Sequence, residues 1–97
     1  MVIRHIAIRG RVQGVGYRAF VEDEAARRGI AGFVRNRRDG SVEALFEGTA
    51  EAVAGMIEAC RRGPRGAKVD VIEERDASAD DLLARDQGGA FTVLPTA

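Results

Sequence analysis

The chain has 97 residues, of which 45% are hydrophobic, and its 15 basic side chains balance 15 acidic ones. This length predicts one domain over residues 1–97, and the neutral net charge argues against broad electrostatic binding of nucleic acid. The single cysteine excludes an internal disulfide, and one histidine is too few for a Cys/His zinc site. No apolar run approaches the roughly 20 residues that span a bilayer. We therefore expect a cytoplasmic monomer with no metal, no cofactor and no nucleic-acid or membrane partner.

The first half of the chain predicts a strand, a helix and a β-hairpin in that order. Residues 2–9 alternate apolar and polar side chains, which favours a strand. Over residues 17–28 the apolar side chains recur at three- and four-residue steps, the spacing of a helix that buries one face. Residues 30–37 and 41–47 then predict two strands, and the Asp-Gly dipeptide at 39–40 is typical of the tight turn between antiparallel neighbours.

The second half of the chain predicts another helix and two further strands. Thr49 is a good N-cap, and the helix after it carries the most regular apolar stripe of the chain, which includes Cys60. Strands are predicted at 67–74 and, more briefly, at 90–94, and the acidic segment 76–89 between them predicts a loop with one helical turn. The order βαββαβ plus a short terminal strand predicts an α+β, ferredoxin-like two-layer sandwich, with two helices on one face of an antiparallel sheet.

The glycine-rich stretch GRVQGVGYRAF, at residues 10–20, allows three interpretations. Its glycines formally match a dinucleotide-binding fingerprint, but that motif needs a parallel βαβ unit, whereas the next strand here leads into an antiparallel hairpin. A second interpretation is a simple sharp turn from strand to helix. The third is an anion site, because a glycine-rich turn into a helix directs backbone N–H groups and the positive end of the helix dipole at one small volume.

Two features of the helix start are consistent with an anion site. No Ser, Thr, Asp or Asn precedes the helix to cap its first amides, so a ligand can satisfy them instead. Arg18 lies in the first turn, where the helix dipole disfavours a cation unless an anion binds beside it. The loop alone leaves the anion site and the simple turn about equally supported.

Two other reactive side chains have structural explanations. Cys60 and Arg65 superficially resemble a cysteine phosphatase loop, but their spacing is one residue short and Cys60 belongs to an apolar helix face. His5 lies on an alternating strand and is expected to be structural or exposed. Neither Cys60 nor His5 is therefore expected to take part in catalysis.

The glycine-rich motif GRVQGVGYR is followed by GIAGFVRNRRDGSVEALFEG and then by CRRGPRGAKVD. In this order and spacing the three segments resemble the acylphosphatases, a family of small enzymes with a ferredoxin-like fold. The resemblance extends to about Glu74, and residues 91–93 resemble the family's terminal strand. It implies a metal-independent hydrolase that cleaves acyl phosphates, the mixed anhydrides of carboxylic and phosphoric acid, with inorganic phosphate as product and inhibitor.

The resemblance also implies roles for individual residues. Backbone amides of the loop and Arg18 would hold the phosphoryl group, and Asn36 would orient the attacking water. The implied phosphate-binding residues are Arg11, Val12, Gln13, Gly14, Val15, Gly16, Tyr17 and Arg18. The family frequently has phenylalanine at the position of Tyr17, so the extra hydroxyl needs a partner that the sequence does not name. The acidic segment 76–87 has no clear counterpart in the family.

The chemistry of an acyl phosphate fits this small set of residues. Its leaving group is a weakly basic carboxylate that departs with little help from a general acid, so the enzyme needs positioning and charge stabilisation above all. The alternative is a non-catalytic ferredoxin-like module that binds an anion. An RNA-binding module is disfavoured because the chain is neutral, has few aromatic side chains and lacks an aromatic-rich segment on the third predicted strand.

Overall fold

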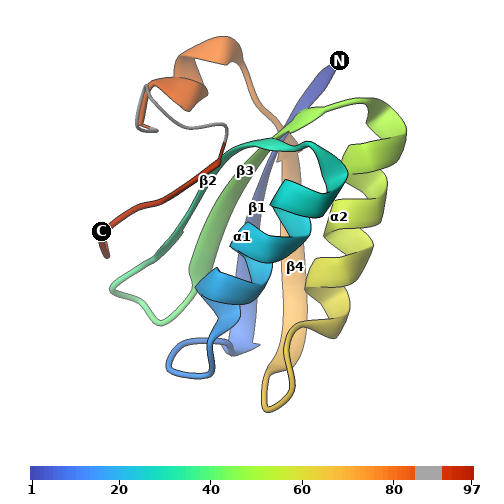
Figure 1. The fold of residues 1–97 in the computed structure, drawn as a ribbon. Coiled ribbons are helices and arrows are strands. Elements are labelled where there is room, and N and C mark those ends of the chain that lie inside the picture. The colour runs from blue at the N-terminus through green and yellow to red at the C-terminus, as the bar shows by residue number, and fades with distance from the viewer. Residues whose placement is uncertain (85–90) are drawn as a thin grey trace.

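The described residues form a five-stranded sheet with two α-helices on one face (Figure 1). The computed structural model describes residues 1–84 and 91–97. In chain order the elements are β1 (Val2–Arg11), α1 (Tyr17–Arg28), β2 (Ala31–Asn36), β3 (Val42–Gly48), α2 (Ala50–Arg62), β4 (Lys68–Asp76), the 3-10 helix η1 (Ala79–Ala84) and β5 (Phe91–Val93). The predicted βαββαβ sandwich with a short terminal strand is confirmed.

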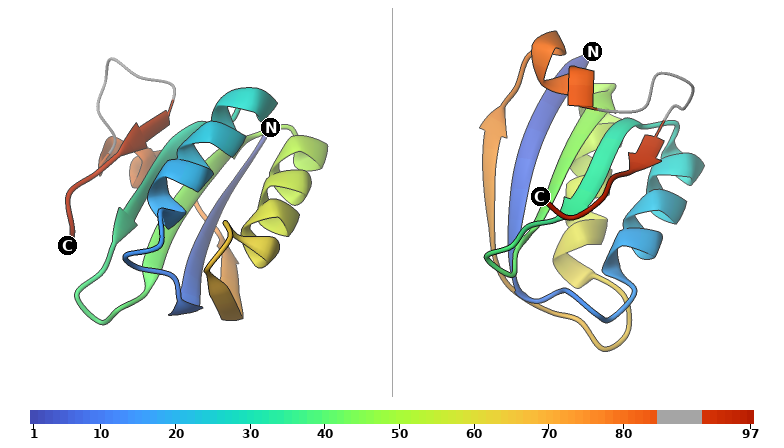
Figure 2. Two further views of the ribbon diagram at one scale, coloured as in Figure 1. Left: turned by 60° about the horizontal axis from the view of Figure 1, so that its bottom comes forward. Right: turned by 90° about the vertical axis from the view of Figure 1, so that its left-hand side faces the viewer.

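The strand order across the sheet is β4-β1-β3-β2-β5. The first four strands pair antiparallel, as the sequence predicts. β5 instead pairs parallel with the edge of β2, so the complete sheet is mixed rather than purely antiparallel. The direction of β5 follows from the path of the chain, because β4 ends at the same end of the sheet at which β2 begins. Figure 2 shows η1 at that end of the sheet.

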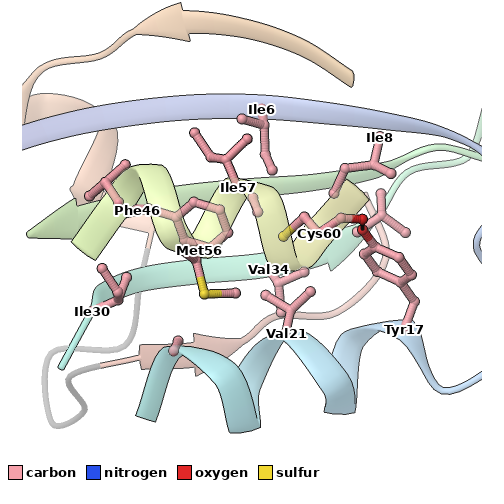
Figure 3. Close-up of a cluster of buried hydrophobic side chains, with 14 of the residues drawn as sticks. Ile6, Ile8, Tyr17, Val21, Ile30, Val34, Phe46, Met56, Ile57 and Cys60 are labelled. Carbon is pink, nitrogen blue, oxygen red and sulfur yellow. Dashed lines mark hydrogen bonds between the residues drawn. The ribbon is translucent and has the colours of Figure 1, made fainter. Parts of the chain in front are cut away.

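Alternating side chains divide the apolar residues between the two faces of the sheet. On the helix face Ile6, Ile8 and Phe46 pack against Met56 and Cys60 of α2 and form the centre of the main core (Figure 3). On the opposite face a smaller cluster consists of Phe33, Leu45 and Leu82. Leu82 belongs to η1, so the helical turn expected within the acidic segment covers part of the open sheet face. Residues 85–89 of that segment lie outside the described residues.

β1 continues beyond its predicted end at Arg9 and reaches Arg11. Its pairing with β4 shifts between Arg9 and Gly10, which is a β-bulge, and this interrupts the alternation from which the strand was predicted. A Cβ atom on Gly10 would lie 2.1 Å from the carbonyl oxygen of Lys68, so the close approach of the two strands requires glycine. The longer strand carries the chain directly to the glycine-rich loop.

Candidate active site

Residues 12–16 connect β1 to α1 and are called the glycine-rich loop below. Gly14 and Gly16 have φ angles of 76° and 79°, in the left-handed region that other residues rarely adopt. Gly16 is the N-cap of α1, and no side chain caps the helix, as the sequence predicts. Among the described residues, the backbone N–H groups of residues 13–19 find no acceptor. These donors, together with the helix dipole, are available to an anion.

A cavity of about 210 Å³ lies between the glycine-rich loop, the first turn of α1 and the end of β2. Its lining residues are Val12, Gly14, Gly16, Tyr17, Arg18, Ala19 and Asn36. The strand order explains this proximity, because β1 and β2 both end at the same end of the sheet with only β3 between them. The fold therefore brings Arg18 and Asn36 together, although they belong to different elements.

Arg18 and Asn36 both present unused polar groups to the cavity. Both side chains are partly exposed, and neither forms a hydrogen bond or an ion pair with any residue among 1–84 and 91–97. The backbone around Asn36 is well held, because its carbonyl oxygen accepts a hydrogen bond from the Ala97 N–H at 3.0 Å, and the Arg38 N–H donates to the Ala97 carbonyl at 2.9 Å. The guanidinium of Arg18 and the side-chain amide of Asn36 therefore face the same cavity, and hydrogen bonds fix the backbone that carries Asn36.

Three of the implied phosphate-binding residues do not line the cavity. Arg11 is exposed at the end of β1, directly opposite Lys68 of β4. Val15 is partly buried against the main core. Gln13 directs its side-chain amide to the backbone of the β2–β3 hairpin. Conversely, Ala19 lines the cavity but is not among the residues predicted from the sequence. Its position in the first turn of the helix, beside the predicted anion site, is the signal from which it could have been predicted.

The Tyr17 hydroxyl has a partner in α2. It donates a hydrogen bond to the carbonyl oxygen of Cys60 at 2.5 Å (Figure 3). Burial raises the pKa of the Tyr17 hydroxyl well above its ordinary value, and burial also raises the pKa of the Cys60 thiol to about 12. Cys60 therefore stays protonated in the core, and it contributes no nucleophile to the cavity.

The remaining candidate groups are engaged in structural roles. His5 Nε2 lies 2.7 Å from a carboxylate oxygen of Glu43 on the open face of the sheet, which fits the expectation of a structural histidine. Within the described ranges 1–84 and 91–97, no group of three or more His, Cys, Asp or Glu side chains could hold a metal ion. The groups that the cavity offers to a ligand are thus backbone amides, one guanidinium and one side-chain amide.

The family model of the acylphosphatases matches residues 4–86. The chain belongs to the acylphosphatase family. An acylphosphatase from Azorhizobium caulinodans is 63% identical over 92 residues, which are 95% of this chain and 94% of that protein. One from Rhodopseudomonas palustris strain BisB18 is 56% identical over 95 residues, which cover 98% and 96% of the two chains. The crystal structure of the Bacillus subtilis acylphosphatase superposes with a TM-score of 0.83 at 38% identity and covers 97% of this chain and 99% of that one.

These similarities establish the activity. This acylphosphatase is a hydrolase of acyl phosphates, which yields a carboxylate and inorganic phosphate, and a non-catalytic anion-binding module is not favoured. Among the helices of the described residues, none combines the length and the apolar character that a membrane crossing requires.

Proposed function

We propose that this acylphosphatase binds the phosphoryl group of its substrate in the cavity beside the glycine-rich loop, and that Asn36 orients the water that attacks it. Backbone amides of the loop and the Arg18 guanidinium hold the phosphoryl oxygens. One observation carries the proposal: Arg18 and Asn36 line the same cavity as the loop, and neither side chain has a partner among the described residues. Polar groups held at a cavity without internal partners are free to bind a ligand.

Each group in the cavity has a distinct task. The amides and Arg18 are hydrogen-bond donors, and hydrogen bonds to ionised oxygens are stronger than neutral ones. They stabilise the charge that shifts onto the phosphoryl oxygens in the transition state. The side-chain oxygen of Asn36 accepts a hydrogen bond from water and so turns a water lone pair toward phosphorus, opposite the carboxylate that leaves.

The proton of the attacking water needs an acceptor, and the described residues that line the cavity include no His, Cys, Asp or Glu. The substrate's own phosphoryl oxygens are the remaining basic atoms, so we propose that one of them takes the proton as the P–O bond to water forms. The bond between phosphorus and the carboxylate oxygen breaks, and the carboxylate leaves without protonation. The products are a carboxylate and inorganic phosphate, which balances the reaction.

The experiment that tests these roles separates turnover from phosphate binding. We expect Asn36→Ala to lower kcat for benzoyl phosphate by about a hundredfold, the effect of losing one orienting group, while the inhibition constant of inorganic phosphate stays within about twofold. Thr49→Ala is the matched control, because it removes only the hydrogen bond from the Ala52 N–H that caps α2 at the opposite end of the sheet. Unchanged kcat in Asn36→Ala would remove Asn36 from the mechanism.

We also propose that inorganic phosphate inhibits the enzyme and that the protein is a monomer. Inorganic phosphate presents the same oxygens as the substrate and should inhibit competitively. We propose a monomer, because the exposed large apolar side chains among the described residues, Met1, Val71, Leu83 and Val93, lie on different segments and do not suggest one extensive interface. Light scattering at several protein concentrations tests the monomer, since a molecular mass that rises with concentration would contradict it.

We also propose a cytoplasmic location, which fits the single, buried free cysteine.

A further inference from the structure

Gln13 joins the glycine-rich loop to the β2–β3 hairpin. Its Nε2 atom donates hydrogen bonds to the carbonyl oxygens of Arg37 at 2.7 Å and Ser41 at 2.8 Å. Both acceptors are backbone carbonyls, which cannot donate, so the orientation of the Gln13 amide is unambiguous. Both hydrogens of the NH₂ group are used, and the side chain therefore acts as a bridge between two segments that lie far apart in the sequence.

The two acceptors of Gln13 lie on a closed and well-bonded turn. The Arg37 N–H donates to the Ser41 carbonyl at 2.8 Å, and the Gly40 N–H donates to the Arg37 carbonyl at 3.1 Å. Asp39 accepts hydrogen bonds from both the N–H and the hydroxyl of Ser41. These hydrogen bonds fix the hairpin backbone to which the Gln13 side chain is bonded.

Each end of the bridge lies next to a residue that lines the cavity. Gly14, which follows Gln13, lines one side, and Asn36, which precedes Arg37, lines the other. Among the described residues, the bonds of Gln13 are the only hydrogen bonds that join residues 12–16 to the hairpin. The position of the loop relative to Asn36 therefore depends on this one side chain together with the packing of Val12 and Val15 against the core.

The loop has little else to restrain it. Apart from the two bonds of Gln13, the hydrogen bond from the Phe20 N–H to the Gly16 carbonyl at 3.1 Å is the only one that the loop makes within the described part of the chain. Two of its five positions, Gly14 and Gly16, are glycines in the left-handed region, where no side chain restricts the backbone. Displacements of about 1 Å in the reacting atoms are enough to slow a reaction by about a hundredfold.

We propose that Gln13 is a positioning residue, which sets the distance and angle between the phosphoryl group in the loop and the water held by Asn36. The Gln13 side chain is directed to the hairpin and both of its Nε2 hydrogens are already used, so the side chain acts through the loop and the hairpin rather than on the substrate. This inference rests on the proposed roles of the loop and Asn36.

The test uses Gln13→Ala and Gln13→Met, of which the second keeps most of the side-chain volume without the hydrogen bonds. We expect both variants to lower kcat for benzoyl phosphate by about tenfold or more, with the inhibition constant of inorganic phosphate within about threefold of the unmodified protein. Gln13→Glu has the same shape but directs carboxylate oxygens at the two carbonyls, so it should not restore kcat. Restored kcat in Gln13→Glu would overturn the inference.

A double-mutant cycle distinguishes positioning from general loss of structure. If Gln13 acts by aligning the loop with Asn36, then adding Gln13→Ala to the Asn36→Ala variant should lower kcat further by less than about twofold. Thr49→Ala serves as the stability control, since a comparable loss of stability away from the cavity should leave kcat unchanged. Circular dichroism at the assay temperature shows which variants are folded, and Gln13→Met supplies the measurement if Gln13→Ala is not.

The possible failures are distinguishable. An unmodified chain that does not hydrolyse acyl phosphates, or an Asn36→Ala variant with full kcat, contradicts the proposed function. An impaired Asn36→Ala variant beside Gln13 variants that keep kcat within twofold contradicts the positioning role alone. Effects of Gln13 and Asn36 that multiply, or a phosphate inhibition constant that rises in parallel with the loss of kcat, would also overturn it.

Discussion

The hydroxyl of Tyr17, in the first turn of α1, donates a hydrogen bond to the carbonyl oxygen of Cys60, near the end of α2. The Tyr17 ring is buried, at 2% exposure, and it also packs close to Gly63, where a Cβ atom would come within 3.0 Å of the ring. The residue immediately before Arg18 is thus attached to the second helix. This contact links the stability of the core to the start of the helix that carries the proposed phosphate site.

Tyr17→Phe keeps the ring and removes only this hydrogen bond. We expect the free energy of unfolding to fall by about 1–2 kcal/mol, because the buried carbonyl of Cys60 loses its side-chain donor. Urea denaturation followed by circular dichroism measures the change, and the slope of the transition should stay constant if only the native state is affected. A midpoint equal to that of the unmodified protein would show that the bond contributes nothing.

The thiol of Cys60 should react only when the protein unfolds. Its side chain is fully buried, and burial raises its pKa to about 12, so almost no thiolate is present at pH 8. We expect a thiol reagent to modify the native protein slowly at this pH, and to modify Tyr17→Phe faster in proportion to its lower stability. Rapid, complete labelling of the native protein would contradict the buried position of Cys60.

Glu43 should make stability depend on acid pH. Burial opposes its ionisation, but hydrogen bonds from His5 and Arg35 outweigh this effect, and the pKa of Glu43 lies below the ordinary value of 4.5. The ionised form therefore stabilises the folded state above about pH 4.5, and this contribution is lost as the pH falls through the lowered pKa. In Glu43→Gln the decrease in stability between about pH 5 and pH 3 should be smaller than in the unmodified protein. An equal decrease in both would exclude this role.

Arg18→Gln should weaken phosphate binding and turnover together. The substitution removes the charge and the forked donor of the guanidinium, so we expect a higher inhibition constant for inorganic phosphate and a kcat lower by at least about tenfold. The matched control is Arg65→Gln, since Arg65 is an exposed arginine outside the cavity lining. Normal phosphate inhibition in Arg18→Gln would remove this residue from the site.

Hydrolysis should survive exhaustive chelation. A carboxylate is a good leaving group and, in the proposed mechanism, amides and Arg18 supply the charge stabilisation that a metal ion provides elsewhere. We expect kcat for benzoyl phosphate to be unchanged after dialysis against a strong chelator. Loss of activity that added divalent cations restore would show that a metal takes part.

Local patterns in the sequence specify the order and type of the elements. The apolar periodicities, the Asp-Gly turn at 39–40 and the Thr49 cap are local signals, and each depends on a few neighbouring residues. The same holds for the uncapped start of α1 and the glycine-rich loop, which identified an anion site as one of two local explanations. The bulge after Arg9 was missed because it appears only where β1 meets a partner strand.

Which of these residues come into contact depends on the packing of the whole fold. The bond from Gln13 to the Arg37 carbonyl spans 24 positions, and the bond from Tyr17 to Cys60 spans 43. Such contacts depend on the strand order β4-β1-β3-β2-β5 and on the way both helices pack on one face, so no local pattern encodes them. For the same reason the parallel pairing of β5 with β2 is evident only in the assembled sheet. The spacing of apolar residues indicates which side of an element is buried. The distance between the glycine-rich loop and Asn36, in contrast, depends on how all the elements pack together.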